Sequence, residues 1–298
     1  SYLLISREDV KYFNYMIIIK ALIGSGGACL LLLVFDLGLW SILTANVFSV
    51  LISLLFGRWR FNKTNMNSKR IYKLNIGLLR DFFKYSYKLY IGGIISYLNI
   101  YLMKSFLSIF MTSEKLAFYS MAQDRATLLN KISASANTLL YPRVSRSNES
   151  DSTITTNKAF KIILILGFLS SVILAIVIKP LVYIMYGEAF LPMVIPFLVI
   201  LPGILISGTC DIFTSYFTGS GRSDLIMKLS IFPLILQVIL GLIFIKSFGI
   251  FGAAASFSLG MIFFSFLQIY FFLKLSKTSF RMLIPKSSDY IYIYNFFK

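Results

Sequence analysis

Residues 113–146 place polar and charged side chains where a helix could present them to a buried ligand. These side chains recur at helical spacing, and they are Ser120, Gln123, Asp124, Thr127, Asn130, Lys131, Asn137 and Thr138. The opposite face is apolar, so the pattern predicts a helix with one polar and one apolar face. Arg125 projects from the apolar side, where it needs a neighbouring helix, a water-filled crevice or a lipid phosphate.

A second stripe, within residues 82–110, combines aromatic rings with one ammonium group. Its members are Ser86, Tyr90, Gly93, Tyr97, Tyr101, Lys104 and Ser108. One interpretation is a cavity wall, in which the tyrosine rings contact the faces of sugars and Lys104 contacts an anion. The alternative, which the sequence favours equally, is helix packing with the tyrosine hydroxyls bonded to neighbouring helices.

We expect the two stripes to face one cavity. The helices that carry them are joined by the short segment 111–115, which predicts antiparallel neighbours. Either stripe turned to lipid would leave polar groups unsatisfied. At about 1.5 Å per residue, Lys104 and Lys131 should differ in depth by roughly 16 Å. We therefore expect an anionic head group to contact the two lysines one after the other, Lys131 when the cavity opens inward and Lys104 when it opens outward. Asp124 is expected to hold Lys131 when no ligand is bound.

Asp211 is the third candidate. It lies on a weaker stripe with Gly203, Ser207, Thr214 and Thr218. We favour an ion pair between Asp211 and a basic residue of another helix over a proton or cation site.

The charges inside the apolar segments are mostly basic. They are Lys20, Lys88, Lys104, Arg125 and Lys131 against Asp124 and Asp211. Each charge at the centre of a spanning helix costs about 2.5–3.5 kcal/mol, so the basic excess needs a reason. An anionic ligand that enters the helix bundle supplies one.

Catalytic and metal-binding patterns are missing from the sequence. No nucleophile lies beside a base, and no acidic pair is spaced to hold the metal of a nucleotide sugar. The chain has no histidine, and its two cysteines, Cys29 and Cys210, lie in apolar segments. We therefore predict no enzyme activity, no metal site and no cofactor, and leave a proton or sodium gradient open as a source of energy.

Composition predicts an all-α polytopic membrane protein. Of the 298 residues, 57% are hydrophobic, and the mean hydropathy is +0.79. About eight segments approach the roughly 20 residues that a spanning helix needs. They cover residues 13–35, 38–57, 82–110, 115–141, 159–178, 190–218, 225–246 and 250–273. The net charge of +17 is explained by the positive-inside rule and anionic phospholipid, without nucleic acid as a partner.

Most basic residues fall in alternate loops, which predicts that both termini of the chain are cytoplasmic. The basic segment 58–80 divides the chain. Two helices in 1–57 should end an N-terminal lobe, the linker 58–80 and the tail 276–298 should be cytoplasmic, and 81–275 should form a six-helix lobe. Similar turns around Gly38 and Gly249 suggest two homologous halves, and we expect the chain to be a fragment that lacks about four N-terminal helices.

Six stretches between Leu79 and Leu275 resemble the polysaccharide-type transporters of the MOP superfamily, the Wzx-like flippases of lipid-linked oligosaccharides. They are Leu79 to Ser86, Ala117 to Ala122, Leu140 to Arg146, Tyr186 to Phe190, Leu201 to Gly203 with Gly219 to Arg222, and Phe248 to Ala254. The resemblance implies a two-lobe, MATE-like bundle around a central cavity. It covers the C-terminal two-thirds of the chain.

The same resemblance implies a substrate and a location. The substrate would be a polyprenyl-pyrophosphate-linked oligosaccharide, an O-antigen or capsule repeat unit, moved by alternating access across the inner membrane of a bacterium. A polysaccharide polymerase and a chain-length regulator are left open as partners. The alternatives are a cation-coupled multidrug exporter of the same superfamily, which would want an acidic cavity, and a membrane-embedded polymerase or transferase, which would want a large outer loop.

Overall fold

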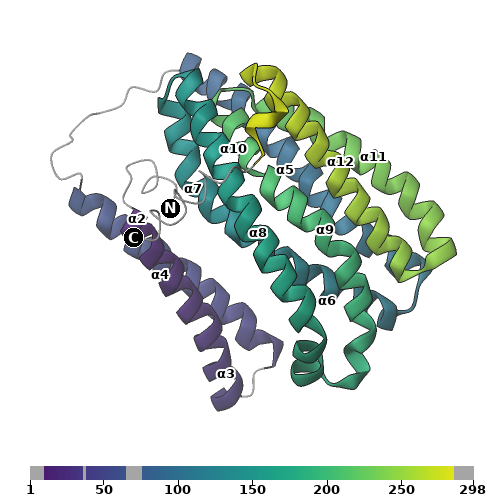
Figure 1. Cartoon of the computed structure of the whole chain (residues 1–298). Helices are drawn as coiled ribbons and strands as arrows, with labels where there is room; N and C mark the ends of the chain where they lie inside the picture. Colours follow the sequence, from purple (N-terminus) through teal and green to yellow (C-terminus); the bar gives the residue numbers. More distant parts are fainter. Residues whose placement is uncertain (1–9, 36–37, 65–75, 285–298) are drawn as a thin grey trace. The chain divides into compact units, whose positions relative to one another are not determined.

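The computed structural model describes residues 10–35, 38–64 and 76–284, and every regular element in these ranges is a helix. The chain divides into two compact units, Ser1–Leu74 and Asn75–Lys298. Figure 1 labels the helices of both units. This architecture confirms the all-α fold class predicted from the apolar segments.

The first unit is a helical hairpin. Its elements are α2 (Val10–Ala21), the π-helical turn η1 (Leu22–Gly26), α3 (Gly27–Phe35) and α4 (Leu39–Thr64). Small residues line the contact between the two arms: a Cβ on Gly24 would lie 3.5 Å from Oγ of Ser49 in α4, which is an ordinary contact distance. The arms thus pack through small side chains, as is common for helices in a membrane.

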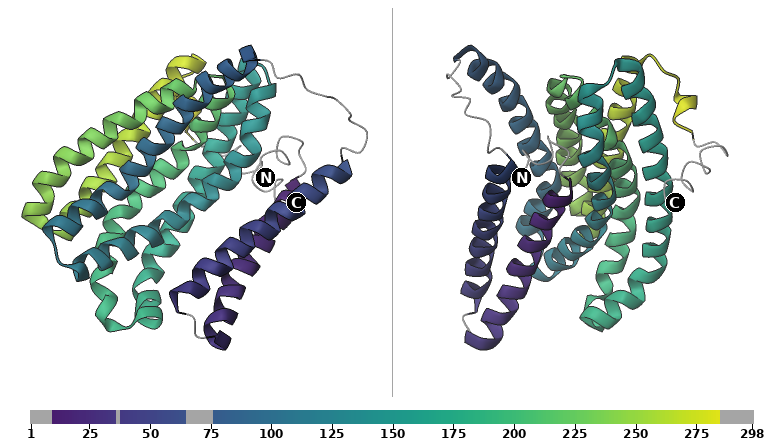
Figure 2. Two further views of the ribbon diagram at one scale, coloured as in Figure 1. Left: turned by 180° about the vertical axis from the view of Figure 1, so that it is seen from behind. Right: turned by 90° about the vertical axis from the view of Figure 1, so that its left-hand side faces the viewer.

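The second unit holds the candidate site. Its elements are α5 (Ile76–Phe110), α6 (Ser113–Ala126), η2 (Thr127–Leu129), α7 (Asn130–Arg146), α8 (Glu149–Tyr186), η3 (Glu188–Met193), α9 (Val194–Cys210), α10 (Ile212–Gly219), α11 (Ser223–Phe248), α12 (Ile250–Ser276) and η4 (Phe280–Met282). The helix α9 packs against α6, α8 and α12, while α11 packs between α5 and α12. Figure 2 shows α5 along one face of this bundle beside α11.

Aromatic and aliphatic side chains fill the interior of the second unit. One buried cluster centres on Phe197 and Phe257, and another on Phe213 and Phe272, whose ring centroids lie 4.4 Å apart. The outward faces are also apolar; Ile184, for example, is 81% exposed. A surface of this kind suits lipid better than water.

Seven segments of the described residues are long and apolar enough to cross a membrane. The expected span 115–141 is not among them, although it is helical. It consists of α6 and α7, which are joined by the 3₁₀ turn η2 and are less apolar than the other spans. The polar stripe of residues 113–146 explains this difference, because it lowers the mean hydropathy of the helix that carries it.

Two expected boundaries shift. The helix α4 ends at Thr64 and α5 begins at Ile76, so both enter the segment 58–80 that was expected to be a linker. Residues 65–75 and most of the expected tail, 285–298, lie outside the described residues. The turn glycines Gly38 and Gly249 share a positive φ, 54° and 58°, a conformation that favours glycine.

Candidate functional site

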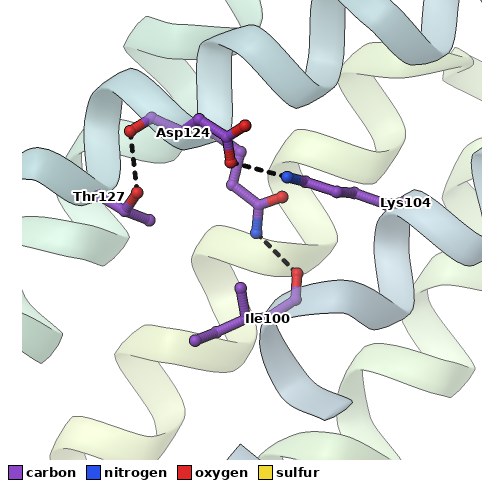
Figure 3. Close-up of polar contacts among 5 residues, drawn as sticks. Ile100, Lys104, Asp124 and Thr127 are labelled. Carbon is purple, nitrogen blue, oxygen red and sulfur yellow. Dashed lines mark hydrogen bonds and ion pairs between the residues drawn. The ribbon is translucent and has the colours of Figure 1, made fainter. Parts of the chain in front are cut away.

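An ion pair joins the two polar stripes. Nζ of Lys104, in α5, lies 2.7 Å from Oδ1 of Asp124, in α6 (Figure 3). The lysine side chain is 17% exposed, whereas the aspartate side chain is 64% exposed. The structure therefore corrects the expectation that Asp124 holds Lys131, because the carboxylate crosses to the neighbouring helix instead.

A buried amide fastens the same two helices. Gln123 is fully buried, and its Nε2 donates a 2.8 Å hydrogen bond to the carbonyl oxygen of Ile100 (Figure 3). The carbonyl oxygen of Asp124 accepts a hydrogen bond from Oγ1 of Thr127, the first residue of the turn η2. The contact between α5 and α6 thus has a buried part and a solvent-exposed part.

The predicted tyrosines lie on the exposed face of α5. Tyr90, Tyr97 and Tyr101 are 73%, 60% and 40% exposed. The ring centroids of Tyr97 and Tyr101 lie 4.2 Å apart, and Nζ of Lys104 lies 5.3 Å from the Tyr101 ring centroid. Within this unit the three tyrosines are not packed inside the bundle. They form an open aromatic face along α5, and Tyr101, at one end of it, lies beside the ion pair.

The other two basic candidates have different surroundings. Arg125 donates a hydrogen bond to the hydroxyl of Tyr186, at the end of α8, and its guanidinium carbon lies 5.7 Å from that ring centroid. The helix α8 thus supplies one partner for Arg125. Lys131 is exposed and forms no ion pair with any described residue.

Asp211 separates α9 from α10 and bonds to an amide rather than to a basic residue. Nδ2 of Asn137, in α7, lies 2.9 Å from Oδ2 of Asp211, and Oδ1 of the same Asn137 side chain accepts a 2.6 Å hydrogen bond from Oγ of Ser215. On the next turn, Thr214 accepts a hydrogen bond from Gln268 of α12. The expected ion pair is therefore replaced by a polar network that joins three helices.

Asp211 also lines a cavity of about 190 Å³ within the second unit. Polar lining residues come from α5, η2, α7, α9 and α11, and they include Ser96, Asn99, Thr127, Asn130, Ser207 and Ser230. The side-chain oxygens of Asn99 and Asn130 are buried and accept no hydrogen bond from a described residue. A buried oxygen without a donor is costly, so the cavity suits water or a cation that these oxygens would bind.

Some of these residues gave little signal in the sequence. Asn99 and Ser230 lie in strongly apolar segments far apart in the chain, yet Nδ2 of Asn99 donates a 3.0 Å hydrogen bond to the carbonyl oxygen of Ser230. Isolated polar residues on otherwise apolar helices are the available signal. It marks polar contacts between helices but does not say which helices meet.

Comparison with solved structures shows the fold. A mutant of the Vibrio cholerae MATE transporter VcmN matches with a TM-score of 0.79 at 13% identity, covering 94% of this chain and 66% of that one. A MOP superfamily transporter from Pyrococcus furiosus matches with a TM-score of 0.55 at 21% identity, covering 68% and 48%. A MATE in the straight conformation matches with a TM-score of 0.70 at 14% identity, covering 87% and 62%.

The chain thus spans between about half and two-thirds of the length of these transporters, and it has a helical MOP-like fold. No curated protein matches the sequence. A family model described as polysaccharide biosynthesis protein matches residues 7–196, which is more than half of the chain. The chain is therefore a member of this family of polysaccharide biosynthesis proteins, as the resemblance of its motifs predicted.

Proposed function

We propose that the chain is part of a flippase that moves a polyprenyl-pyrophosphate-linked oligosaccharide, such as an O-antigen or capsule repeat unit, across the inner membrane of a bacterium by alternating access. The observation that carries the proposal is the open aromatic face of α5, where the Tyr97 and Tyr101 rings lie together and Tyr101 lies beside Lys104. The exposed Lys131 of α7 supplies a second ammonium group. The membership of a polysaccharide biosynthesis family supports this choice of substrate.

The chemistry of the face matches the two ends of such a substrate. Tyrosine rings offer flat apolar surfaces to sugars, and their hydroxyls offer hydrogen bonds. The ammonium groups of Lys104 and Lys131 offer charge-assisted hydrogen bonds to phosphate oxygens. These groups bind and orient without breaking a bond, so the proposal assigns no enzyme activity to the chain.

In this proposal the substrate moves between the two lysines while the cavity between the lobes changes from open on one side of the membrane to open on the other. Asp211 and the cavity that it lines would couple this motion to a proton or cation gradient, because the unpartnered oxygens of Asn99 and Asn130 fit such an ion. Anionic phospholipid would neutralise the basic loops, and both termini of the chain would be cytoplasmic. A polysaccharide polymerase and a chain-length regulator remain candidate partners.

One observation favours a second candidate, a cation-coupled multidrug exporter. Asp124 is the more exposed member of its ion pair, and a cationic drug would be attracted to its carboxylate. For the Pyrococcus furiosus transporter, reverse polarity of the binding pocket suggests a different function. Polarity of the open face is thus the property by which we distinguish the two candidates.

Charge replacement in cells tests the proposal. In the full-length protein, Lys104→Ala and Lys131→Ala should each abolish surface glycan at a normal protein level, and the corresponding arginine variants should partly restore it. Lys115→Ala is the matched control, because Lys115 is an exposed lysine of α6 outside the polar stripe. Normal surface glycan in both alanine variants would contradict the proposed role of the open face.

A further inference from the structure

The ion pair between Lys104 and Asp124 is unequal in its exposure to solvent. The lysine side chain is 17% exposed and the aspartate side chain 64% exposed. An ammonium group that is largely removed from water is costly without an anionic partner. The carboxylate of Asp124, by contrast, is mostly exposed in this unit, so it gives up less burial than the lysine when the two separate. Any anion that replaces Asp124 therefore only has to satisfy Lys104.

The helices can stay together when this ion pair opens. The bond from buried Gln123 to the carbonyl oxygen of Ile100 lies beside the ion pair and does not involve either charge (Figure 3). Asp124 also lies in the last turn of α6, which ends at Ala126 just before the 3₁₀ turn that starts at Thr127. The carboxylate is thus carried by a helix end that is anchored separately, and its side chain can rotate away alone.

We propose that Asp124 is a built-in competitor for the substrate's diphosphate at Lys104. This inference rests on the proposed function and assigns a role that the open face alone does not require. Without substrate, Asp124 satisfies Lys104. An arriving diphosphate displaces the carboxylate and takes its place beside the Tyr101 ring, which lies 5.3 Å from Nζ of Lys104.

Two consequences follow from this competition. A neutral or cationic molecule cannot displace Asp124, since it offers Lys104 no negative charge, so the pair selects for anions. The returning carboxylate also helps to expel the bound diphosphate. It thereby lowers the affinity for the diphosphate and speeds its release. Asp124 is thus a specificity-determining residue that acts through Lys104, and its removal should tighten binding.

Binding measurements on the full-length protein test the inference. The probe is geranylgeranyl diphosphate, added to purified protein in nanodiscs of zwitterionic phosphatidylcholine. Asp124→Asn should bind the probe about 2- to 5-fold more tightly than the wild type, the range expected for a partly exposed ion pair. Asp124→Glu keeps the charge and should bind like the wild type. Glu114→Gln removes one negative charge from the exposed start of the same helix and should change nothing.

A double variant shows whether the effect passes through Lys104. Lys104→Ala should weaken binding of the probe. The double variant with Asp124→Asn should bind the probe as weakly as Lys104→Ala alone. Unchanged or weaker binding in Asp124→Asn, with weakened binding in Lys104→Ala, would overturn the competition and leave the proposed function intact. Equal binding in the wild type and Lys104→Ala would overturn both.

The lipid composition distinguishes the two sources of phosphate. We expect the tighter binding of Asp124→Asn to persist when phosphatidylglycerol replaces part of the phosphatidylcholine, because a diphosphate carries more charge than a phospholipid head group. If Asp124→Asn no longer binds the probe more tightly in phosphatidylglycerol, the position that Asp124 vacates beside Lys104 is taken by phospholipid. That result would overturn the assignment of this position to the substrate.

Discussion

The crossing of α9 and α12 allows a sharp prediction of stability. A Cβ on Gly203 would lie 2.7 Å from Cα of Ser258 and 2.8 Å from its carbonyl oxygen. Atoms in ordinary contact are about 3.5–4.0 Å apart, so Gly203→Ala requires the two helices to separate by roughly 1 Å. The obstructing atoms belong to the backbone and cannot rotate away. Overpacking of this kind costs typically 1–3 kcal/mol.

Thermal unfolding of the full-length protein in detergent measures this cost. For a domain of this size, about 1 kcal/mol corresponds to roughly 2–4 °C, so Gly203→Ala should lower the midpoint by about 2–12 °C. Gly93→Ala is the matched control, because a Cβ there meets nothing within 4 Å. Equal midpoints for Gly203→Ala and the wild type, or an equal loss in Gly93→Ala, would refute the close crossing.

Three further predictions concern the polar network and the topology. Asn137→Ala removes the side-chain donor to Asp211 and should cost about 1–3 kcal/mol in the free energy of unfolding, measured with denaturant against the wild type. Asp211→Asn should leave binding of geranylgeranyl diphosphate largely intact even where surface glycan falls; loss of binding in a folded variant would show that Asp211 contacts substrate. In a Cys29→Ser background, a cysteine at Ser247 should react with an impermeant thiol reagent on intact cells, while one at Asn67 should resist, and labelling at Asn67 would overturn the topology.

Helical periodicity singled out Lys104 and Asp124, which the structure brings together, while their part in binding stays a prediction. The lengths of the spans are constrained by the bilayer, and polar residues at helical spacing mark a face that lipid cannot cover. Lys104 and Asp124 both lie on the stripes that the sequence predicted. The fold class was predictable for the same reason, because in a membrane only helices and closed barrels satisfy the backbone.

Pairing was harder to predict than position. Asp124 and Lys131 lie on one stripe, but seven residues correspond to about 10.5 Å along a helix, beyond the reach of an ion pair without distortion. Lys104 is far from Asp124 in sequence but adjacent in space, because α5 and α6 meet at a short turn. A stripe shows which way a side chain faces, whereas its partner depends on how far two helices slide past one another.

The breaks in the helices carried even less signal. Neither the 3₁₀ turn Thr127–Leu129 nor the break at Asp211 contains a proline or a glycine. Tertiary contacts explain the break at Asp211 better than local propensity, since Asn137 bonds to both the side chain and the carbonyl oxygen of that residue. The sequence therefore showed an acid inside an apolar segment but not the amide that replaces its expected basic partner.

Transport by the purified full-length protein in proteoliposomes tests the central claim most directly. Two substrates are compared side by side, a lipid-linked oligosaccharide with a polyprenyl diphosphate carrier and a cationic dye. We predict movement of the oligosaccharide between leaflets, lost in Lys104→Ala and Lys131→Ala and kept in Lys115→Ala, with no export of the dye. Export of the dye without movement of the oligosaccharide would contradict the proposed function.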